Sequence, residues 1–110
     1  MPRIYISGPM SGIVDLNFPA FDKARDICLA CGYEVVSPAD LDRNRPRYSY
    51  EECLRDDFKH LLECDQILML EGWKTSYGAT MEFFIAKAIG LKVHYQVEFP
   101  QFLFAQTPPA

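Results

Sequence analysis

The sequence has no long hydrophobic run. Its first apolar run begins at Ile4 and stops at Gly8, which is too short for a signal peptide or a membrane span. The chain also lacks an excess of basic residues: 11 Lys and Arg stand against 15 Asp and Glu, and the formal net charge is -4. A nucleic-acid polymer requires a basic surface. These absences predict a cytoplasmic protein that binds neither a membrane nor a nucleic-acid polymer.

Paired cysteine motifs with the spacing of a metal site are also missing. Cys28 and Cys31 form a C-x-x-C motif, but no second pair accompanies it, and His60 and His94 form no motif with it. In a cytoplasmic protein the four cysteines are thiols rather than disulfides. Cys28 and Cys31 fall on the apolar face of a predicted helix, so we expect a buried core pair.

Strand-like and helix-like segments alternate along the chain. Its 110 residues contain no internal repeat and no low-complexity linker, which predicts one domain over residues 1–110 with an apolar tail at 98–110. Strands are predicted at residues 3–7, 33–37, 66–70 and 92–97. Helices are predicted with Pro19 in the first turn and Gly32 after the last, over residues 50–64, and from a Ser76 cap to Gly90. Residues 38–49 are predicted as a long loop.

The alternation predicts an α/β fold, a three-layer Rossmann-like or flavodoxin-like sandwich with a parallel sheet of four to five strands. Ligands of such folds bind beyond the carboxyl ends of the strands. The loops at that edge follow Ser7, Ser37 and Leu70, so these loops are the predicted ligand-binding edge.

The loop after the first predicted strand has a composition suited to an oxyanion. Glycines allow close approach of the backbone, and serines supply donors. The alternative is a tight turn that is only rich in glycine. The candidate substrate-binding residues in this loop are Ser7, Gly8, Pro9, Met10, Ser11 and Gly12.

Carboxylates are the candidate catalytic groups. Glu82 lies near the start of the last predicted helix, where Gly78 leaves space around it and the helix N-terminus is expected to keep it ionised. The alternative is an ordinary Glu favoured by the helix dipole. Asp56 and Asp57 lie in the helix over residues 50–64, and one is expected to point inward unless both form a solvated face.

Two further features lie beside the predicted ligand edge. Arg43, Arg45 and Arg47 form a basic cluster, which is either a phosphate clamp that favours nucleotides over nucleosides or a solvated loop. Trp73 either stacks on a base or covers the start of the last helix.

These motifs together resemble the nucleoside 2-deoxyribosyltransferase-like superfamily, and most closely a small phage and bacterial branch of unassigned function. The resemblance covers residues 4–95. It is carried by YISGPMSG at 5–12, NFPAF at 17–21, Asp57, Leu61 and Asp65 before the strand 67–70, Gly72-Trp73, Ser76-Tyr77-Gly78-Ala79, Glu82, Ala86 and Gly90.

The resemblance implies a role for each matched residue. Glu82 matches the nucleophile that attacks C1′ of the sugar, and Tyr5 matches the residue that orients it. Asp57 matches an Asp that helps to bind or protonate the substrate. Ser76 matches an Asp in the transferases and a Ser in the deoxynucleotide N-hydrolases, whereas Pro9 replaces a Ser that helps those hydrolases to bind phosphate.

The leading hypothesis is an enzyme that cleaves or transfers the N-glycosidic bond of a (deoxy)nucleoside or its 5′-monophosphate. The reaction passes through a glycosyl ester on Glu82 and needs no metal or organic cofactor. The alternative is a non-catalytic module that binds or senses a nucleotide. A third possibility is a structural or host-interaction protein, whose sign is a pocket filled by its own side chains.

The apolar tail predicts a homo-oligomer, a dimer or higher. Four large apolar side chains fall within six positions there: Phe99, Phe102, Leu103 and Phe104. The alternative is that the tail folds back over the last helix of its own chain.

Overall fold

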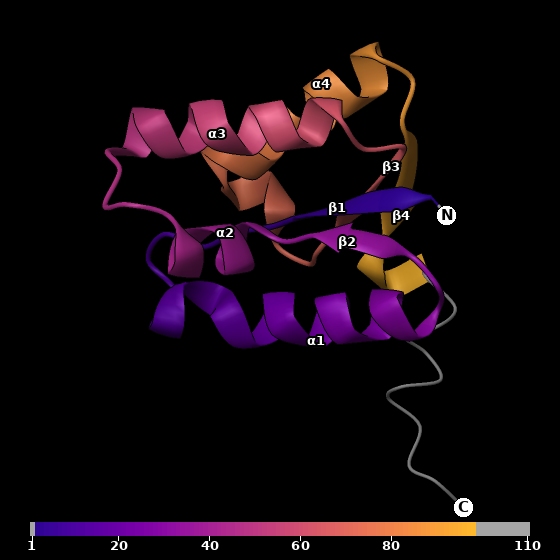
Figure 1. Ribbon diagram of the computed structural model, residues 1–110, viewed down its shortest axis with the longest axis horizontal. Helices are drawn as coiled ribbons and strands as arrows, with labels where there is room; N and C mark the ends of the chain where they lie inside the picture. Colours follow the sequence, from indigo (N-terminus) through magenta and orange to yellow (C-terminus); the bar gives the residue numbers. More distant parts are fainter. Residues whose placement is uncertain (1, 99–110) are drawn as a thin grey trace, which may run out of the picture.

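The computed structural model describes residues 2–98 and contains one four-stranded parallel sheet. The strand order is β2-β1-β3-β4, which matches the first four strands of the flavodoxin-like order and confirms the predicted α/β fold (Figure 1). The strands are β1 Arg3–Ser7, β2 Glu34–Val36, β3 Gln66–Met69 and β4 Lys92–Tyr95. The helices are α1 Phe18–Ala30, α2 Pro38–Asn44, α3 Tyr50–Leu62 and α4 Tyr77–Ala88, with short 3-10 turns η1 Val14–Asn17, η2 Trp73–Thr75 and η3 Gln96–Glu98.

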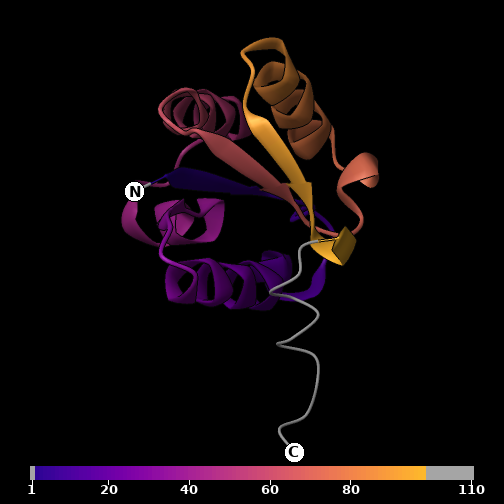
Figure 2. The same cartoon turned by 90° about the vertical axis from the view of Figure 1, so that its right-hand side faces the viewer.

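Helices cover both faces of the sheet and make three layers. Figures 1 and 2 show α1 on one face and α3 with α4 on the other. Alternate residues of the central strands feed two separate cores. Ile4 and Leu68 pack with Phe21 on the α1 side, whereas Tyr5 and Ile67 pack on the other side with residues of α3 and α4. Strands covered on both faces explain why the central strands are apolar throughout.

The prediction of a long loop over residues 38–49 is wrong for its first part, because Pro38–Asn44 form α2, and it holds only for residues 45–49. Ser37 is extended, and Pro38 takes the first helical position, where a missing N–H costs nothing. Asp40 in the first turn and Arg43 in the last complement the helix dipole. The helix contacts both α1 and α3, so it connects the layers on the two sides of the sheet.

The C-x-x-C motif is also not the predicted buried pair. Cys28 is buried in the core on the α1 side, but Cys31 is exposed. Cys31 caps the end of α1, and the chain then turns at Gly32, whose φ of +90° suits glycine. Because α1 ends before Cys31, this residue does not continue the buried face of the helix on which Cys28 lies.

Local capping fixes the starts of α3 and α4. Ser49 and Glu52 form a reciprocal capping box at α3, which the sequence analysis did not identify. At α4 the hydroxyl of Ser76 accepts a hydrogen bond from the backbone N–H of Ala79 at 3.2 Å, as predicted for a capping serine. The start of α4 matters for function because this helix carries Glu82.

The expectations about membrane spans and about the apolar tail can be compared only with residues 2–98. Within residues 2–98, no helix is long and apolar enough to cross a membrane. The tail residues Phe99, Phe102, Leu103 and Phe104 lie outside the described residues, so the homo-oligomer stays a prediction.

Gly8 lies where the first loop leaves β1, against the end of β3. A Cβ atom at Gly8 would lie 2.8 Å from the Cβ of Leu70, which is buried and hydrogen-bonded to the backbone of Ser7. We predict that Gly8→Ala lowers the free energy of unfolding by about 1–3 kcal/mol, because the Leu70–Ser7 hydrogen bond keeps the two chain segments too close for the added methyl group. Urea denaturation measures this loss. The control Ser11→Ala, exposed in the same loop, should change it by less than about 0.5 kcal/mol; equal losses in both variants would contradict the steric explanation.

Candidate active site

The carboxyl ends of β1, β2 and β3 meet at one edge of the sheet, as parallel pairing requires. A pocket of about 160 Å³ opens there, and we call it the Glu82 pocket. Because this space is open, the pocket is not filled by its own side chains. Its lining includes the polar or ionisable side chains Ser11, Asp42, Arg45, Tyr50, Asp57, Ser76 and Glu82.

Glu82 is buried in the second turn of α4 and is held by two hydroxyl groups of β1. The phenol of Tyr5 donates to Glu82 Oε2 at 2.5 Å, and the hydroxyl of Ser7 donates to Oε1 at 2.6 Å. Tyr5 and Ser7 lie two residues apart on one strand, so their side chains face the same side of the sheet. The carboxyl group is therefore fixed in position from both of its oxygens, beneath the pocket.

The expectation that the helix N-terminus keeps Glu82 ionised is wrong. Glu82 is only 5% exposed, and burial raises its pKa from 4.5 to about 8, against the opposing effect of the hydrogen bonds from Ser7 and Tyr5. The helix dipole acts mainly within the first turn, whereas Glu82 lies six residues after the Ser76 cap. Loss of solvent outweighs the dipole at this depth.

Tyr5 keeps its proton over the whole range in which Glu82 titrates. The phenol is fully buried, and burial together with the neighbouring Glu82 carboxylate raises its pKa well above 10. A phenol that stays protonated remains a donor to Glu82 in both of its charge states. This geometry agrees with the orienting role that the resemblance implies for Tyr5.

Asp57 is the inward-facing member of the acidic pair, and the alternative of a solvated face is wrong for it. It is 9% exposed and accepts a hydrogen bond from Arg45 at 2.8 Å. Burial raises the pKa of Asp57 to about 6, although Arg45 opposes the shift. Asp42 and Asp56 also bind the Arg45 guanidinium, so three carboxylates share one cation.

Arg45 completes this charge cluster, and its side chain is only 9% exposed. Burial acts against its charge, but the hydrogen bonds that it donates to Asp57 and Asp56 outweigh burial and raise its pKa. Its Nε–H group is buried without a hydrogen-bond acceptor. Within residues 2–98, no group of three or more His, Cys, Asp or Glu side chains is arranged to hold a metal ion.

The structure does not gather Arg43, Arg45 and Arg47 into one clamp. Arg43 lies on α2 and binds Asp22 of α1 through two hydrogen bonds of 2.8 and 2.7 Å. Arg45 turns the other way, toward α3, and Arg47 is exposed outside the pocket lining. Arg43 lies in the last turn of α2, whereas Arg45 and Arg47 follow the end of this helix at Asn44, so the three side chains do not converge.

Some residues of the first loop line the Glu82 pocket, and others do not. Gly8, Met10 and Ser11 line the Glu82 pocket, as do Ser76 and Gly78 of the α4 start. Their contacts with a substrate stay predictions.

Two other residues of that loop lie outside the lining of the Glu82 pocket. Gly12 takes a φ of +79°, which glycine adopts without strain, so the turn explains why a glycine occupies this position. Pro9 lines an adjoining cavity of about 260 Å³, which we call the Tyr50 cavity. The Tyr50 cavity shares Met10, Ser11, Tyr50 and Ser76 with the Glu82 pocket, so the two spaces adjoin.

Trp73 packs at the start of α4, which is the second of its two interpretations. Its ring stacks on Phe83 with the centroids 4.6 Å apart, and it lies outside the lining of the Glu82 pocket. A role in stacking on a base within that pocket is therefore not supported.

Asp42 and Tyr50 also line the Glu82 pocket, although neither is among the candidate residues predicted from the sequence. Asp42 precedes Arg45 by three residues, the spacing of an ion pair on a helix. That signal carried no weight while the segment was expected to be a loop. Tyr50 is the first residue of α3, and the Ser49–Glu52 capping box was the available sign that a helix begins there.

Known proteins are similar to this chain in sequence profile and in fold. The profile of a family described as a domain of unknown function (DUF4406) matches residues 2–95. The chain belongs to this family. No curated protein matches it. A solved structure described as a 2-deoxyribosyltransferase from the psychrotolerant bacterium Bacillus psychrosaccharolyticus is similar, with a TM-score of 0.68 and 18% identity over 84% of this chain and 70% of that chain.

This likeness confirms the predicted nucleoside 2-deoxyribosyltransferase-like fold for the DUF4406 domain. At 18% identity it bears on the fold alone. Any role for Glu82, Tyr5 and Asp57 is therefore argued from the geometry of this chain and not from the similar structure.

The raised pKa of Glu82 makes stability depend on pH. The folded protein holds the Glu82 proton where the unfolded chain has released it, so this contribution is full below about pH 4.5 and is lost as pH rises through about 8. We predict that the free energy of unfolding of the wild type falls between about pH 6.5 and pH 9, above the titration of Asp57. Glu82→Gln should flatten this decline, because an amide does not ionise.

Urea denaturation at several pH values measures both proteins. The same pH slope in the wild type and in Glu82→Gln would show that Glu82 is already ionised in the folded state.

Proposed function

We propose that this DUF4406 domain cleaves or transfers the N-glycosidic bond of a nucleoside, with Glu82 as the nucleophile. The observation that carries the proposal is the buried Glu82 carboxyl, fixed by Tyr5 and Ser7 beneath a pocket at the carboxyl edge of the sheet. Its fold is also that of a solved 2-deoxyribosyltransferase. In such folds ligands bind at this edge.

In the proposed reaction one oxygen of ionised Glu82 bonds to C1′ of the sugar. The C1′–N bond breaks, its electron pair leaves with the base, and the base takes up a proton. The product is a glycosyl ester on Glu82, which water or the nitrogen of a second base then displaces. Displacement by water makes the protein a hydrolase, and displacement by a base makes it a transferase. Each step inverts C1′, so the overall reaction retains its configuration.

Asp57 is the proposed proton donor to the leaving base. It lines the same pocket as Glu82, and its pKa of about 6 lies closer to neutrality than that of an ordinary Asp. Because the pKa of Glu82 lies above that of Asp57, ionised Glu82 beside protonated Asp57 is a minor state at pH 7. The positive charge that develops on the sugar favours ionisation of Glu82 during the reaction itself.

The charges of the pocket favour an uncharged nucleoside over its 5′-monophosphate. Arg45 is the one cationic side chain in the lining of the Glu82 pocket among the described residues, and three carboxylates already bind it. The Tyr50 cavity has no Lys, Arg or His among its described lining residues. A phosphate dianion would therefore enter a site with an excess of negative charge.

The two adjoining spaces fit the two halves of a nucleoside. The Glu82 pocket, at about 160 Å³, is smaller than a typical pocket for a drug-sized ligand of roughly 300–1,000 Å³. We place the sugar there, with C1′ toward Glu82, and the base in the Tyr50 cavity. Tyr50 and Tyr77 supply aromatic faces in the wall of that cavity.

The second candidate function is a module that binds or senses a nucleotide without cleaving it. Glu82 favours this candidate in one respect, because a carboxyl group with a pKa of about 8 is mostly protonated at neutral pH. A protonated Glu82 is a hydrogen-bonding group rather than a nucleophile. Binding without release of base would identify this function.

We predict that the pure protein releases free base from one or more deoxynucleosides and that Glu82→Gln abolishes the release. An amide has nearly the shape of the carboxyl group but cannot attack C1′. Chromatography of free base measures the release over a panel of deoxynucleosides and their 5′-monophosphates, and the nucleosides should be the better substrates.

The matched control is Glu51→Gln, which makes the same chemical change on the exposed first turn of α3 and should keep the wild-type rate. Wild-type base release by Glu82→Gln would exclude Glu82 as the nucleophile. Faster reaction of the monophosphates would contradict the charge argument.

A further inference from the structure

The largest described cavity lies apart from the Glu82 pocket. Its volume is about 780 Å³, and it opens where β3 and β4 end, beside the second turn of α4. We call it the Trp73 cavity. It shares no lining residue with the Glu82 pocket or the Tyr50 cavity, so the proposed function leaves it unused.

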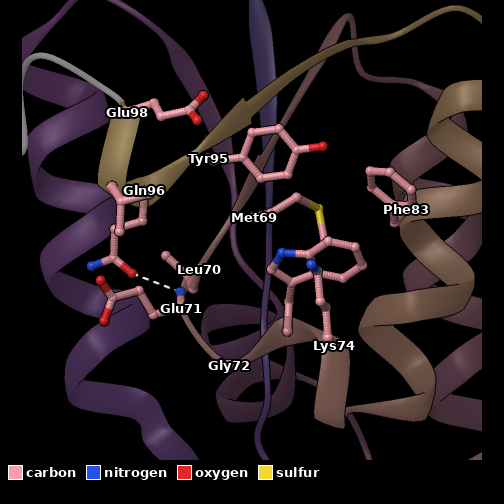
Figure 3. A pocket seen from close by; sticks show the side chains of 11 residues that line it. Met69, Leu70, Glu71, Gly72, Lys74, Phe83, Tyr95, Gln96 and Glu98 are labelled. Carbon is pink, nitrogen blue, oxygen red and sulfur yellow. Dashed lines mark hydrogen bonds between the residues drawn. The ribbon is translucent and has the colours of Figure 1, made fainter.

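Aromatic rings from three elements form its wall. Trp73 comes from η2, Phe83 from α4 and Tyr95 from β4. Trp73 lies 4.6 Å from Phe83 and 6.4 Å from Tyr95 between ring centroids. Figure 3 shows Tyr95 above Met69 and Phe83 across the opening, so an apolar surface faces the space. These rings are only partly buried, which makes the wall suited to an apolar occupant.

The three charged residues of the lining, Glu71, Lys74 and Glu98, are all exposed. The side-chain oxygen of Gln96 accepts a hydrogen bond from the backbone N–H of Glu71 at 2.8 Å, as the dashed line in Figure 3 marks. The ammonium group of Lys74 lies 5.7 Å from the centre of the Trp73 ring. A cationic ligand would therefore compete with Lys74 for this ring, and the chemistry favours a neutral, apolar occupant.

The end of the described chain lies at the same cavity. Val97 and Glu98 belong to its lining, and Val97 is 58% exposed. The sequence that follows Glu98 is FPQFLFAQTPPA, which carries no charged side chain and three Phe residues within six positions. Residue 102 is four residues past Glu98, within about 14 Å of extended chain. A tethered segment of this kind has an effective concentration in the mM range.

We propose that the Trp73 cavity is the docking site of residues 99–110 of the same chain, with the Phe side chains seated among Trp73, Phe83 and Tyr95. This proposal takes up the alternative in which the tail folds back over its own chain, and it replaces the homo-oligomer that the apolar tail predicts. Docking covers the aromatic wall and the end of β4. It also brings the docked segment into contact with the loop that leads to α4, because Trp73 belongs to this loop. Gly72 of the loop lies beside Pro9 of the first loop, so closely that an added Cβ atom at Gly72 would be 3.4 Å from the Pro9 ring.

The single tryptophan of the chain makes the proposal testable in the full-length protein. The double substitution Phe102→Ser and Phe104→Ser should shift the emission of Trp73 to longer wavelength and increase its quenching by acrylamide, because water replaces the apolar occupant. Circular dichroism checks that the variant stays folded. The control Gln101→Ser, a polar exchange in the same segment, should leave both signals at their wild-type values.

Two outcomes would overturn the proposal. Unchanged emission and quenching of Trp73 in the folded double variant would show that the segment does not occupy the cavity. A wild-type signal that changes to that of the variant on dilution, with a matching fall in mass by light scattering, would assign the cavity to a second copy of the chain. A signal independent of protein concentration is the result expected for docking within one chain.

Discussion

The burial of one carboxyl group organises the candidate site. Glu82 belongs to α4, and both hydroxyl groups that hold it belong to β1, so two hydrogen bonds join a helix to the centre of the sheet. A buried carboxyl is costly without partners, and the donors reduce that cost without removing it, as the raised pKa of Glu82 shows. The same burial that penalises the charge gives the group a pKa near neutrality, where it can change protonation state during a reaction.

The second constraint is the sharing of Arg45 by three carboxylates. Asp42 comes from α2, whereas Asp56 and Asp57 come from α3, so the guanidinium connects two helices beside the Glu82 pocket. A single buried cation cannot neutralise three carboxylates, and this surplus of negative charge adds to burial in raising the pKa of Asp57. The arrangement places two carboxyl groups with different environments in one pocket, which is the pattern that separates a nucleophile from an acid.

The sequence predicted the features that depend on local patterns. The four strands, the Ser76 cap and the meeting of the three loops at one edge of the sheet follow from apolar runs, turn residues and the topology of parallel sheets. The motifs around Tyr5 and Glu82 identified the fold. Tertiary contacts decided the rest. The prolines of residues 38–49 indicated a loop, but Pro38 begins a helix. A loop gives no reason to expect the Asp42–Arg45 ion pair, whose spacing is that of a helix. The predicted arginine clamp does not form, because two of its arginines bind different partners. The charge state of Glu82 depends on burial depth, which helix position alone does not reveal.

The central claim is that Glu82 forms a covalent bond to the sugar, and trapping that bond tests it most directly. A 2′-fluoro-substituted deoxynucleoside suits this purpose, because fluorine at C2′ destabilises the positively charged transition state and slows breakdown of the intermediate. Mass spectrometry of digested protein should find one fluoropentosyl group on the peptide that contains Glu82, and none in Glu82→Gln. Release of base with a label on another residue, or with no label on Glu82 at any time, would contradict the account.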